Sequence, residues 1–352
     1  MKDAVQTALL GVSGYAGMEL ARLLLHHPRL KGRPAVFLGR AEAGEDSSLT
    51  ALHPQLMDNN GSARLKIEPF SWDLLKSRRV DILVLATPHG QSREYAPLAL
   101  EHGIRVIDLS GAWRLNEPAN RAIYKFENES APVAVHVQAK AVYGSPELHR
   151  DEIRTAGLVA NPGCYATCVI LALKPLLSAG WVDLDHGIVS DAKSGVSGAG
   201  KAPTAKTHYM YAADNLSAYG VFGHRHTGEL LEQLGLDRSQ IVFTPHLLPI
   251  PRGILATNYV SFKDKKNSAD VAALYRSFYA NSPMVRLFGP GNLPQIQYSV
   301  RTNYCDIGFE LDTDGQRCVI VSCLDNLLKG AAGQAVENLN LMCGWEESEG
   351  LA

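Results

Sequence analysis

Thr7-Ala-Leu-Leu-Gly-Val-Ser-Gly-Tyr-Ala-Gly17, written TALLGVSGYAG, is the stretch that decides the fold of the first half of the chain. Its apolar start predicts a buried strand over Thr7–Gly11, and the apolar spacing of Met18–Leu25 predicts a helix. Between them, glycines allow a tight turn and let the backbone approach a pyrophosphate, which the amide N–H groups and dipole of the helix N-terminus favour. The stretch therefore predicts a dinucleotide-binding turn. Its candidate cofactor contacts are Gly11, Ser13, Gly14, Tyr15, Ala16 and Gly17.

Further apolar runs extend this pattern. Strands are predicted over Ala35–Leu38, Asp81–Ala86 and Arg105–Leu109, and a helix over Ser92–His102. Strands that alternate with helices predict a parallel sheet with helices on both faces. Ligands in such sheets gather at the carboxyl ends of the strands, so the turns after the later strands should also open onto the cofactor. We interpret His89, in one of these turns, as a loop histidine and not a catalyst. The candidate contacts in these turns are Thr87, Pro88 and Ser110.

The residue after the second strand bears on the choice of cofactor. A carboxylate at this position would hydrogen-bond to the ribose 2′-hydroxyl of NAD, but the sequence here is Leu38-Gly39-Arg40. An arginine suits a 2′-phosphate instead. Arg40 therefore favours NADP over NAD, with a solvated surface charge as the alternative interpretation.

Length and charge narrow the class of protein. A chain of 352 residues, 46% of them hydrophobic, exceeds what one core usually organises, so two domains are expected. With 34 basic and 36 acidic residues, the formal charge is −2. That balance, without a basic stripe, argues against nucleic acid and anionic membranes as partners. The N-terminal stretch suits no signal peptide, and no segment reaches the roughly 20 apolar residues of a membrane span. We expect a cytoplasmic protein.

The cysteines give no sign of a metal site. None of the six forms the C-x-x-C pair of a zinc site, so no metal is expected. In a reducing compartment they should be free thiols. Most should be core residues, because free cysteine is among the most buried types. Cys168, inside a long apolar run, is one of these.

Cys164 differs from the others in its position. Gly157–Ala160 predicts a strand and Asn161–Gly163 a turn. Cys164 then begins a helix that should run through Leu173 and break at Pro175. A thiolate at a helix N-terminus feels the positive dipole and free N–H donors, which lower its pKa and keep it nucleophilic. Backbone amides of the same turn can hold an oxyanion on the group that the sulfur attacks.

A reactive cysteine needs a proton acceptor, and GHRHTGE at 223–229 offers two. Its His224 and His226 flank an arginine between a glycine and a predicted helix. We interpret this cluster as part of a site, with two structural histidines as the alternative.

SGVSGAGK at 194–201 is a glycine- and serine-rich loop that ends in a cation. Such a loop can hold an anion through backbone N–H groups. It is not a Walker A loop, because Ala202 follows Lys201 where Ser or Thr is required, and no triphosphate site is predicted.

Taken together, nine motifs resemble the N-acetyl-γ-glutamyl-phosphate reductase family of arginine biosynthesis, nearly end to end and in the same order. They are GVSGYAG at 11–17, ATPHG at 86–90, YGSPELHR at 143–150, NPGCYATC at 161–168, SGVSGAGK at 194–201, SAY at 217–219, GHRHTGE at 223–229, FTPHLLPIPRGIL at 243–255 and DNLLKGAAGQAVENLN at 325–340.

The resemblance implies the fold and the assembly. It implies an α/β chain with a Rossmann NADP-binding domain and an α+β catalytic domain, as in aspartate-semialdehyde and glyceraldehyde-phosphate dehydrogenases. We expect the first domain over 1–150 with 326–352 and the catalytic and oligomerisation domain over 151–325. The family further suggests a homodimer or homotetramer.

The resemblance also implies the chemistry. The family reduces an acyl phosphate to an aldehyde with NADPH. Cys164 would attack the acyl carbon, expel phosphate and form a thioester, which hydride converts to a thiohemiacetal and then to the semialdehyde. A histidine would handle the protons. Its place in the H-R-H motif favours His224, with His226 as the alternative.

Substrate contacts follow from the same resemblance. Arg114 matches the position expected near the phosphate, Asn326 should lie near the nicotinamide and Lys329 near the site mouth. Further candidates for the substrate's anionic groups are Ser194, Gly195, Lys201 and Arg225. The chain departs from the family pattern at Ser145, Ala112-Trp113 and Gly228, and the second of these leaves the shape of the phosphate pocket open.

Three other functions remain open. A sister reductase would act on aspartyl phosphate or on a glutamyl or aminoadipyl phosphate attached to a carrier protein, with the same fold and mechanism. In a catalytically silent NADP-binding sensor, other residues would replace the nucleophile or the base. Cys164 and both histidines are present, however. A cysteine hydrolase would not need the glycine turn.

Overall fold

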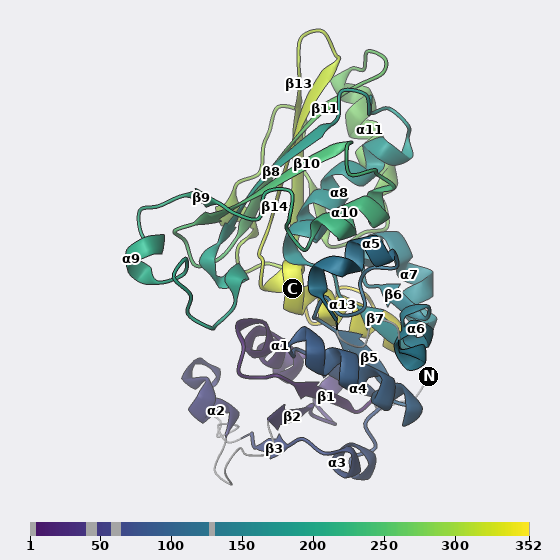
Figure 1. Ribbon diagram of the computed structural model, residues 1–352, viewed down its shortest axis with the longest axis vertical. Coiled ribbons are helices and arrows are strands. Elements are labelled where there is room, and N and C mark those ends of the chain that lie inside the picture. The colour runs from purple at the N-terminus through teal and green to yellow at the C-terminus, as the bar shows by residue number, and fades with distance from the viewer. Residues whose placement is uncertain (1–4, 40–47, 58–64, 127–130, 352) are drawn as a thin grey trace. The chain divides into compact units, whose positions relative to one another are not determined.

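The computed structural model describes residues 5–39, 48–57, 65–126 and 131–351. It divides into two compact units (Figure 1). The first unit is formed by Met1–Arg114, Lys125–Asn161 and Ala332–Ala352, and the second by Leu115–Tyr124 and Pro162–Ala331. The divisions fall after Asn161 and Ala331 instead of near residues 150 and 325. The first differs because the sheet of the first unit continues through Leu158–Ala160.

The first unit is built on a seven-stranded sheet of order β3-β2-β1-β4-β5-β7-β6. Every neighbouring pair is parallel, so the predicted parallel sheet is confirmed. Both of its faces are covered, since Leu9 and Leu10 point to opposite faces and both are buried. The strands are β1 (Thr7–Leu10), β2 (Val36–Gly39), β3 (Ile67–Pro69), β4 (Ile82–Leu85), β5 (Arg105–Asp108), β6 (Ala141–Tyr143) and β7 (Leu158–Ala160).

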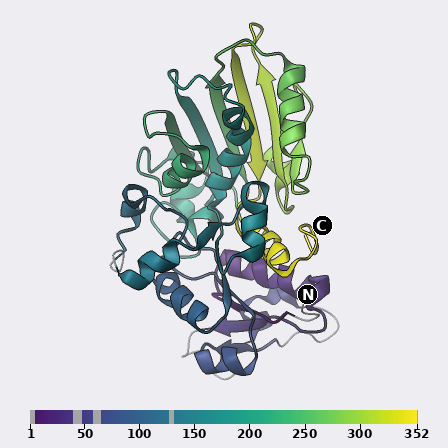
Figure 2. The same cartoon turned by 90° about the vertical axis from the view of Figure 1, so that its right-hand side faces the viewer.

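The helices of the first unit connect these strands (Figures 1 and 2). Two begin earlier than predicted. The helix expected from Met18 starts at Tyr15, directly after the glycine turn. The helix expected from Ser92 starts at His89, because the fixed φ of Pro88 suits a residue that leads into a helix. The helices are α1 (Tyr15–His26), α2 (Leu49–Leu52), α3 (Trp72–Ser77), α4 (His89–Glu101), α6 (Pro132–Gln138), α7 (Pro146–Thr155) and α13 (Gly333–Cys343).

Polar side chains fasten α13 into the first unit, although it comes from the far end of the chain. Asn338 donates to the carbonyl of Gly144 at 2.9 Å and to Oδ1 of Asn161 at 3.0 Å. Buried His27 forms a 2.9 Å hydrogen bond to Oδ1 of Asn340. Burial lowers the pKa of His27, so the ring is neutral and its Nε2–H is the donor in this bond.

The second unit is built on a mixed seven-stranded sheet of order β12-β13-β14-β11-β8-β10-β9. β8 is parallel to β10, whereas β11 is antiparallel to both β8 and β14. The strands are β8 (Ile188–Gly195), β9 (Ser217–Ala218), β10 (Ile241–Leu248), β11 (Ile254–Ser261), β12 (Val285–Leu287), β13 (Cys305–Leu311) and β14 (Arg317–Leu324). The helices are α5 (Pro118–Arg121), α8 (Cys164–Ser178), α9 (Tyr209–Ala212), α10 (Thr227–Leu234), α11 (Ser268–Phe278) and α12 (Ile296–Ser299).

One face of this sheet is covered and the other is open. α8 packs on β11 and β14, and α10 and α11 pack on α8 (Figure 1). The strands accordingly alternate between buried and more exposed residues. On the open face Val189 and Tyr259 remain 44% and 45% exposed.

The predicted break of α8 at Pro175 is wrong, because the helix continues to Ser178. Proline lacks the N–H that would bond the carbonyl four residues earlier, which is that of Leu171. The hydroxyl of Tyr279, on the residue after α11, donates to this carbonyl at 2.5 Å. The freed acceptor is therefore satisfied from a neighbouring segment, and α8 tolerates the proline in its last turn.

Candidate active site

The glycine turn of the first unit is closely packed. Gly11 has φ +101°, a conformation that disfavours any side chain, and a Cβ on it would lie 2.3 Å from the carbonyl oxygen of Ala86. A Cβ on Gly17 would lie 2.1 Å from the carbonyl oxygen of Gly11. Gly14 is the N-cap of α1 and forms no side-chain cap, and a Cβ on it would meet no atom closer than 3.9 Å. The space beside Gly14 and the N–H groups of α1 fit a pyrophosphate.

A hydrogen-bond network joins the carboxyl ends of β4 and β5. Thr87 Oγ1 lies 2.9 Å from Ser92 Oγ, which donates to Asp108 Oδ1 at 2.8 Å. The Ser110 hydroxyl donates to Asp108 Oδ2 at 2.7 Å and accepts from the N–H of Ala112 at 3.1 Å. Burial raises the pKa of Asp108, while its bonds from Ser110 and Ser92 oppose that rise. Asp108 therefore fixes the two turns in which Thr87, Pro88 and Ser110 lie.

Arg114 is buried at the carboxyl edge of the parallel sheet. Its Nε donates to the carbonyl of Asn161 at 2.7 Å, and its Nη2 donates to the carbonyl of Leu109 at 2.8 Å. These bonds anchor the guanidinium to the main chain after β5 and β7. The charge of Arg114 is thereby held at the carboxyl edge of the sheet.

The positions expected to depart from the family pattern are packed within their own units. Trp113 is buried, with the guanidinium of Arg93 4.3 Å above its ring. A Cβ on Gly228 would already lie 2.9 Å from Leu115 Cδ1, so the side chains of this unit fill the space beside it. Ser145 is buried and donates to Glu147 Oε2 at 3.0 Å.

Cys164 is the first residue of α8, as predicted from the sequence. Gly163 precedes it as N-cap with extended backbone and no side-chain cap. The N–H of Gly163 donates to Oε2 of the fully buried Glu229 at 2.9 Å. The turn that carries the thiol is therefore fixed by a carboxylate from α10.

The two histidines occupy different places. The ring of His226 lies against Gly163, where a Cβ would be 2.3 Å from Nε2. Its Nε2 is 4.0 Å from Oε1 of Glu229. The ring of His224 lies edge-on to Tyr165, Tyr219 and Phe243, at centroid distances of 5.6, 5.4 and 5.5 Å. Burial, and to a smaller extent Arg225, lowers the pKa of His224 to about 4.

Two tyrosines complete the surroundings of Cys164. The Tyr165 hydroxyl donates to the carbonyl of His246 at 2.6 Å. Burial raises the pKa of Tyr219 to about 12 and that of Tyr165 further, and the charge of Cys164 adds to both rises. Both phenols therefore stay protonated at neutral pH.

The turn after β14 approaches the same cysteine. A Cβ on Gly330 would lie 2.7 Å from the Cβ of Cys164, and Lys329 beside it is fully buried. Both polar atoms of the Asn326 amide form hydrogen bonds within the second unit. Oδ1 accepts from the N–H of Gly253 at 2.8 Å, and Nδ2 donates to Ser197 Oγ at 2.9 Å. The predicted contact of Asn326 with a nicotinamide stays a prediction.

The predicted anion loop has a different form from the one expected. Ser194 and Gly195 are the last residues of β8, because their pairing with β10 and β11 continues to this point. Ser194 is buried, whereas Lys201 and Arg225 are exposed. Arg40 lies outside the described residues.

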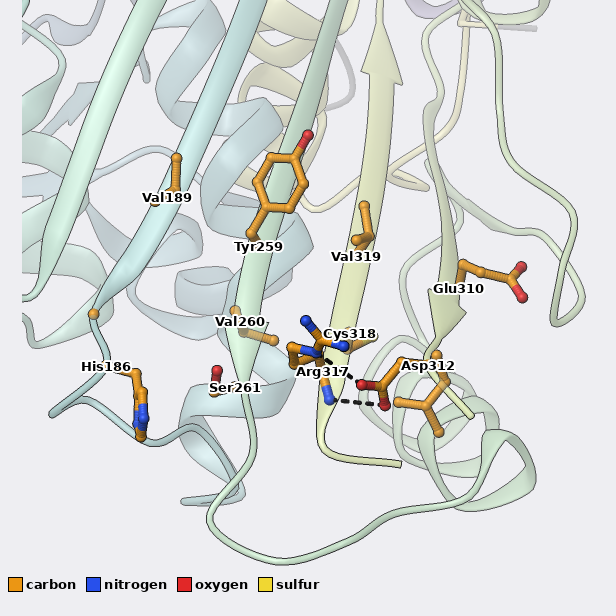
Figure 3. A pocket seen from close by; sticks show the side chains of 12 residues that line it. His186, Val189, Tyr259, Val260, Ser261, Glu310, Asp312, Arg317, Cys318 and Val319 are labelled. Atoms are coloured by element: carbon orange, nitrogen blue, oxygen red, sulfur yellow. Dashed lines mark hydrogen bonds and ion pairs between the residues drawn. The ribbon is translucent and has the colours of Figure 1, made fainter. Parts of the chain in front are cut away.

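A separate pocket of about 420 Å³ lies on the second sheet (Figure 3). It is lined by residues of β8, β11, β13 and β14, among them Val189, Tyr259 and Val319, and an ion pair of 2.9 Å joins Arg317 to Asp312 beside it. None of the predicted site residues lines this pocket.

Glu229 is the site residue that the sequence did not reveal. It follows His226 by three positions across the start of α10, where side chains at that spacing are neighbours. A carboxylate three residues after a candidate base was therefore a usable signal. Its bond to Gly163 could not be foreseen, because it joins residues 66 positions apart.

Comparison with protein families gives two matches. Residues 6–156 match the semialdehyde dehydrogenase NAD-binding domain, and residues 164–326 match the semialdehyde dehydrogenase dimerisation domain. In the described part of the chain, no helix is long and apolar enough to cross a membrane, and no three or more His, Cys, Asp or Glu side chains are grouped to hold a metal ion.

Individual proteins are similar over the whole length. An N-acetyl-gamma-glutamyl-phosphate reductase of Moorella thermoacetica is 40% identical over 351 residues, covering 99% of this chain and 98% of its own. One of Methanosphaera stadtmanae is 42% identical over 352 residues, covering 99% and 97%. Among solved structures, aspartate semialdehyde dehydrogenase II of Vibrio cholerae superposes with a TM-score of 0.70 at 19% identity, covering 97% of this chain and 98% of its own. That likeness concerns the fold.

Proposed function

The chain belongs to the semialdehyde dehydrogenase family, and on that premise we propose that it is an NADPH-dependent N-acetyl-γ-glutamyl-phosphate reductase. The family resemblance and the fold expected from the motifs are confirmed. The full-length similarity to N-acetyl-gamma-glutamyl-phosphate reductases supports the substrate. The observation that carries the chemistry is a thiol on the first turn of α8, where the preceding Gly163 contacts the ring of His226 and donates to the buried carboxylate of Glu229. We further propose a cytoplasmic homodimer or homotetramer, which agrees with the match to a dimerisation domain.

The residues of the first unit fit a dinucleotide. Gly11 and Gly17 make the turn tight, and the open space beside Gly14 lets a pyrophosphate approach the N-terminus of α1. Thr87, Pro88 and Ser110, at the next two strand ends of this unit, are further proposed contacts of the dinucleotide. Asn326 is proposed as a contact of the nicotinamide. NADPH, when bound, supplies the hydride.

Cys164 would act first, as the nucleophile. Its S–H bond breaks, a histidine takes the proton, and sulfur bonds to the acyl carbon while the carbon–oxygen bond to phosphate breaks. The departing phosphate takes up that proton. N–H groups in the first turn of α8 would hold the oxyanion, and Arg114 with Ser194, Gly195, Lys201 and Arg225 would meet the anionic groups of the substrate.

The thioester would then accept hydride at its carbonyl carbon. When the carbonyl bond re-forms, the carbon–sulfur bond breaks, its electron pair returns to sulfur and the semialdehyde leaves. A solvent proton restores the thiol. The overall step consumes one hydride and one proton and releases phosphate.

Reversal of the reaction tests the proposal. Purified protein should reduce NADP with N-acetylglutamate 5-semialdehyde only when phosphate is present, as followed by NADPH absorbance. Aspartate semialdehyde should be a poor substrate at equal concentration. Faster reduction with aspartate semialdehyde, or phosphate-independent reduction, would show that the proposed function is wrong.

Arg40 tests the choice of NADP. Arg40→Asp should weaken NADPH binding by about 10- to 100-fold more than NADH binding, because a charge-assisted bond to the 2′-phosphate contributes about 1.5–3 kcal/mol. Fluorescence titration of both cofactors measures this. Arg22→Asp, on the partly exposed side of α1, is the control and should leave the NADPH-to-NADH ratio unchanged. If Arg40→Asp weakens the binding of NADPH and NADH equally, another group contacts the 2′-phosphate.

A further inference from the structure

His53 is a buried histidine that the proposed reaction does not use. Its side chain is enclosed, with 7% of the residue exposed, and its Nε2 lies 2.7 Å from the main-chain oxygen of Val12. A carbonyl oxygen only accepts hydrogen bonds, so Nε2 carries the proton and donates. Val12 lies in the glycine turn between β1 and α1, 41 positions earlier in the chain. A histidine from a distant segment is therefore bonded to the turn that we expect to hold the pyrophosphate.

The main chain on both sides of His53 is held in place. His53 stands between α2 and a short 3₁₀ helix, Pro54–Leu56. Its N–H donates to the carbonyl of Leu49 at 2.8 Å, and its own carbonyl accepts from the N–H of Leu56 at 2.9 Å. Leu49 is fully buried and anchors α2. The two helices therefore set the position from which the ring of His53 reaches the glycine turn.

The bond from His53 fixes the orientation of one peptide group. The carbonyl of Val12 and the N–H of Ser13 belong to the same peptide, and no cis peptide bond occurs in the described ranges of the chain. In a planar trans peptide these two groups point in opposite directions. Because the oxygen of Val12 faces His53, the N–H of Ser13 points away from it. Ser13 is an exposed residue, which agrees with an N–H on the accessible side of the turn.

Loss of the donor would favour the opposite orientation of this peptide. Val12 is 2% exposed, so its oxygen would lose a hydrogen bond that water cannot readily replace. Rotation of the peptide would bring this oxygen outward to water and turn the N–H of Ser13 inward. A carbonyl oxygen on the accessible side of the turn would repel the anion that an N–H attracts.

We propose that His53 is a positioning residue for the cofactor, whose Nε2–H holds the Val12–Ser13 peptide so that the N–H of Ser13 donates to the pyrophosphate. The identity of the cofactor rests on the proposed function, whereas the bond from His53 to Val12 does not. His53 acts through the turn and does not touch the dinucleotide. Since NADPH and NADH share the pyrophosphate, His53 should affect both alike, in contrast to Arg40.

Two substitutions of similar size separate the donor from the packing. His53→Gln can place an N–H near the position of Nε2, whereas His53→Met fills the space and has no donor. In fluorescence titrations of the full chain, His53→Met should bind NADPH and NADH about 10- to 100-fold more weakly, which corresponds to one lost hydrogen bond to a charged group. His53→Gln should bind both within about threefold of the wild type. If packing alone mattered, the two variants would behave alike, and that result would contradict the proposal.

The same substitution at another buried histidine of the first unit is the control. His27 is fully buried and forms a 2.9 Å hydrogen bond to Asn340. His27→Met should lower the free energy of unfolding, as His53→Met should, because each leaves a buried polar group without its partner. The affinity of folded His27→Met for NADPH should stay at the wild-type value. Equal losses of affinity in the two methionine variants would attribute the effect to general destabilisation and would overturn the proposal.

Fragments of the cofactor locate the effect. Adenosine 2′-monophosphate lacks the pyrophosphate, whereas ADP-ribose 2′-phosphate contains it. In competition with NADPH, His53→Met should weaken the second fragment about 10- to 100-fold and leave the first unchanged. Equal weakening of both fragments would place the effect outside the pyrophosphate, against the proposed role of His53.

Should His53→Met fail to fold, the wild-type chain supplies the test. In amide NMR spectra the Ser13 resonance should move downfield when NADPH binds, as expected of an N–H that donates to a phosphate oxygen. An unchanged Ser13 resonance would contradict the proposal. A wrong choice of acyl substrate would leave all these results intact, because none of the measurements uses one. Wild-type protein that binds neither NADPH nor NADH would instead refute the proposed function together with this role of His53.

Discussion

Cys164→Ser should abolish reduction while NADPH still binds. Loss of a nucleophile that acts within a catalytic group typically costs roughly 10⁴- to 10⁶-fold in turnover. A serine hydroxyl has no anion at neutral pH, and a bond from carbon to its oxygen does not release the aldehyde as a thiolate does. The fold should be retained, because serine is of similar size and suits the start of a helix.

The measurement is steady-state turnover beside a fluorescence titration with NADPH. Cys343→Ser is the matched control, since Cys343 is also half-buried but has a pKa raised to about 12 by burial. It should keep turnover near the wild-type rate. Turnover in Cys164→Ser at even a tenth of that rate would remove Cys164 from the role of nucleophile.

Gly17→Ala should impair both stability and cofactor binding. The new methyl group would meet the carbonyl oxygen of Gly11 at 2.1 Å, so the turn must open or α1 must move away from β1. Such overpacking costs about 1–3 kcal/mol of the free energy of unfolding. Because the same movement displaces the N-terminus of α1, NADPH binding should weaken by about tenfold or more.

Two companion glycines separate these effects. In Gly14→Ala the methyl group would meet nothing closer than 3.9 Å among the described residues, so the variant should keep its stability. Its NADPH binding should weaken, because the proposed pyrophosphate would lie on the side that the methyl group occupies. Gly32→Ala has no atom within 4 Å of the new group and should change neither property. Denaturant unfolding and NADPH titration of the three variants test this; tight NADPH binding by Gly14→Ala would place the pyrophosphate elsewhere.

The features predicted from the sequence are those that short-range physics specifies. The glycine turn and the start of α8 at Cys164 follow from the residues within a few positions of each. The parallel sheet follows from the alternation of strands and helices. In each case the deciding interactions lie close together along the chain, where turn geometry and hydrophobic periodicity act.

The features that were missed depend on contacts between distant residues. A hydroxyl from Tyr279 decides that α8 continues past Pro175, and no local pattern contains that donor. Similarly, the pairing of Glu229 with Gly163 and the approach of Gly330 to Cys164 arise only when separate segments pack. The hydrogen bond of 3.1 Å from the main-chain N–H of His226 to Nδ1 of His224 also lies beyond what the motif predicts.

The position of α13 bears on how the protein is made in the cell. The first unit takes its opening strands from the start of the chain and this helix from the end, where Asn338 bonds to Gly144 and Asn161. During synthesis the chain emerges from its N-terminus at about 5–20 residues per second. The sheet of the first unit therefore lacks α13 until residues 333–343 have been synthesised, and the second unit can complete its own sheet first. The nucleotide-binding half begins first and is completed last.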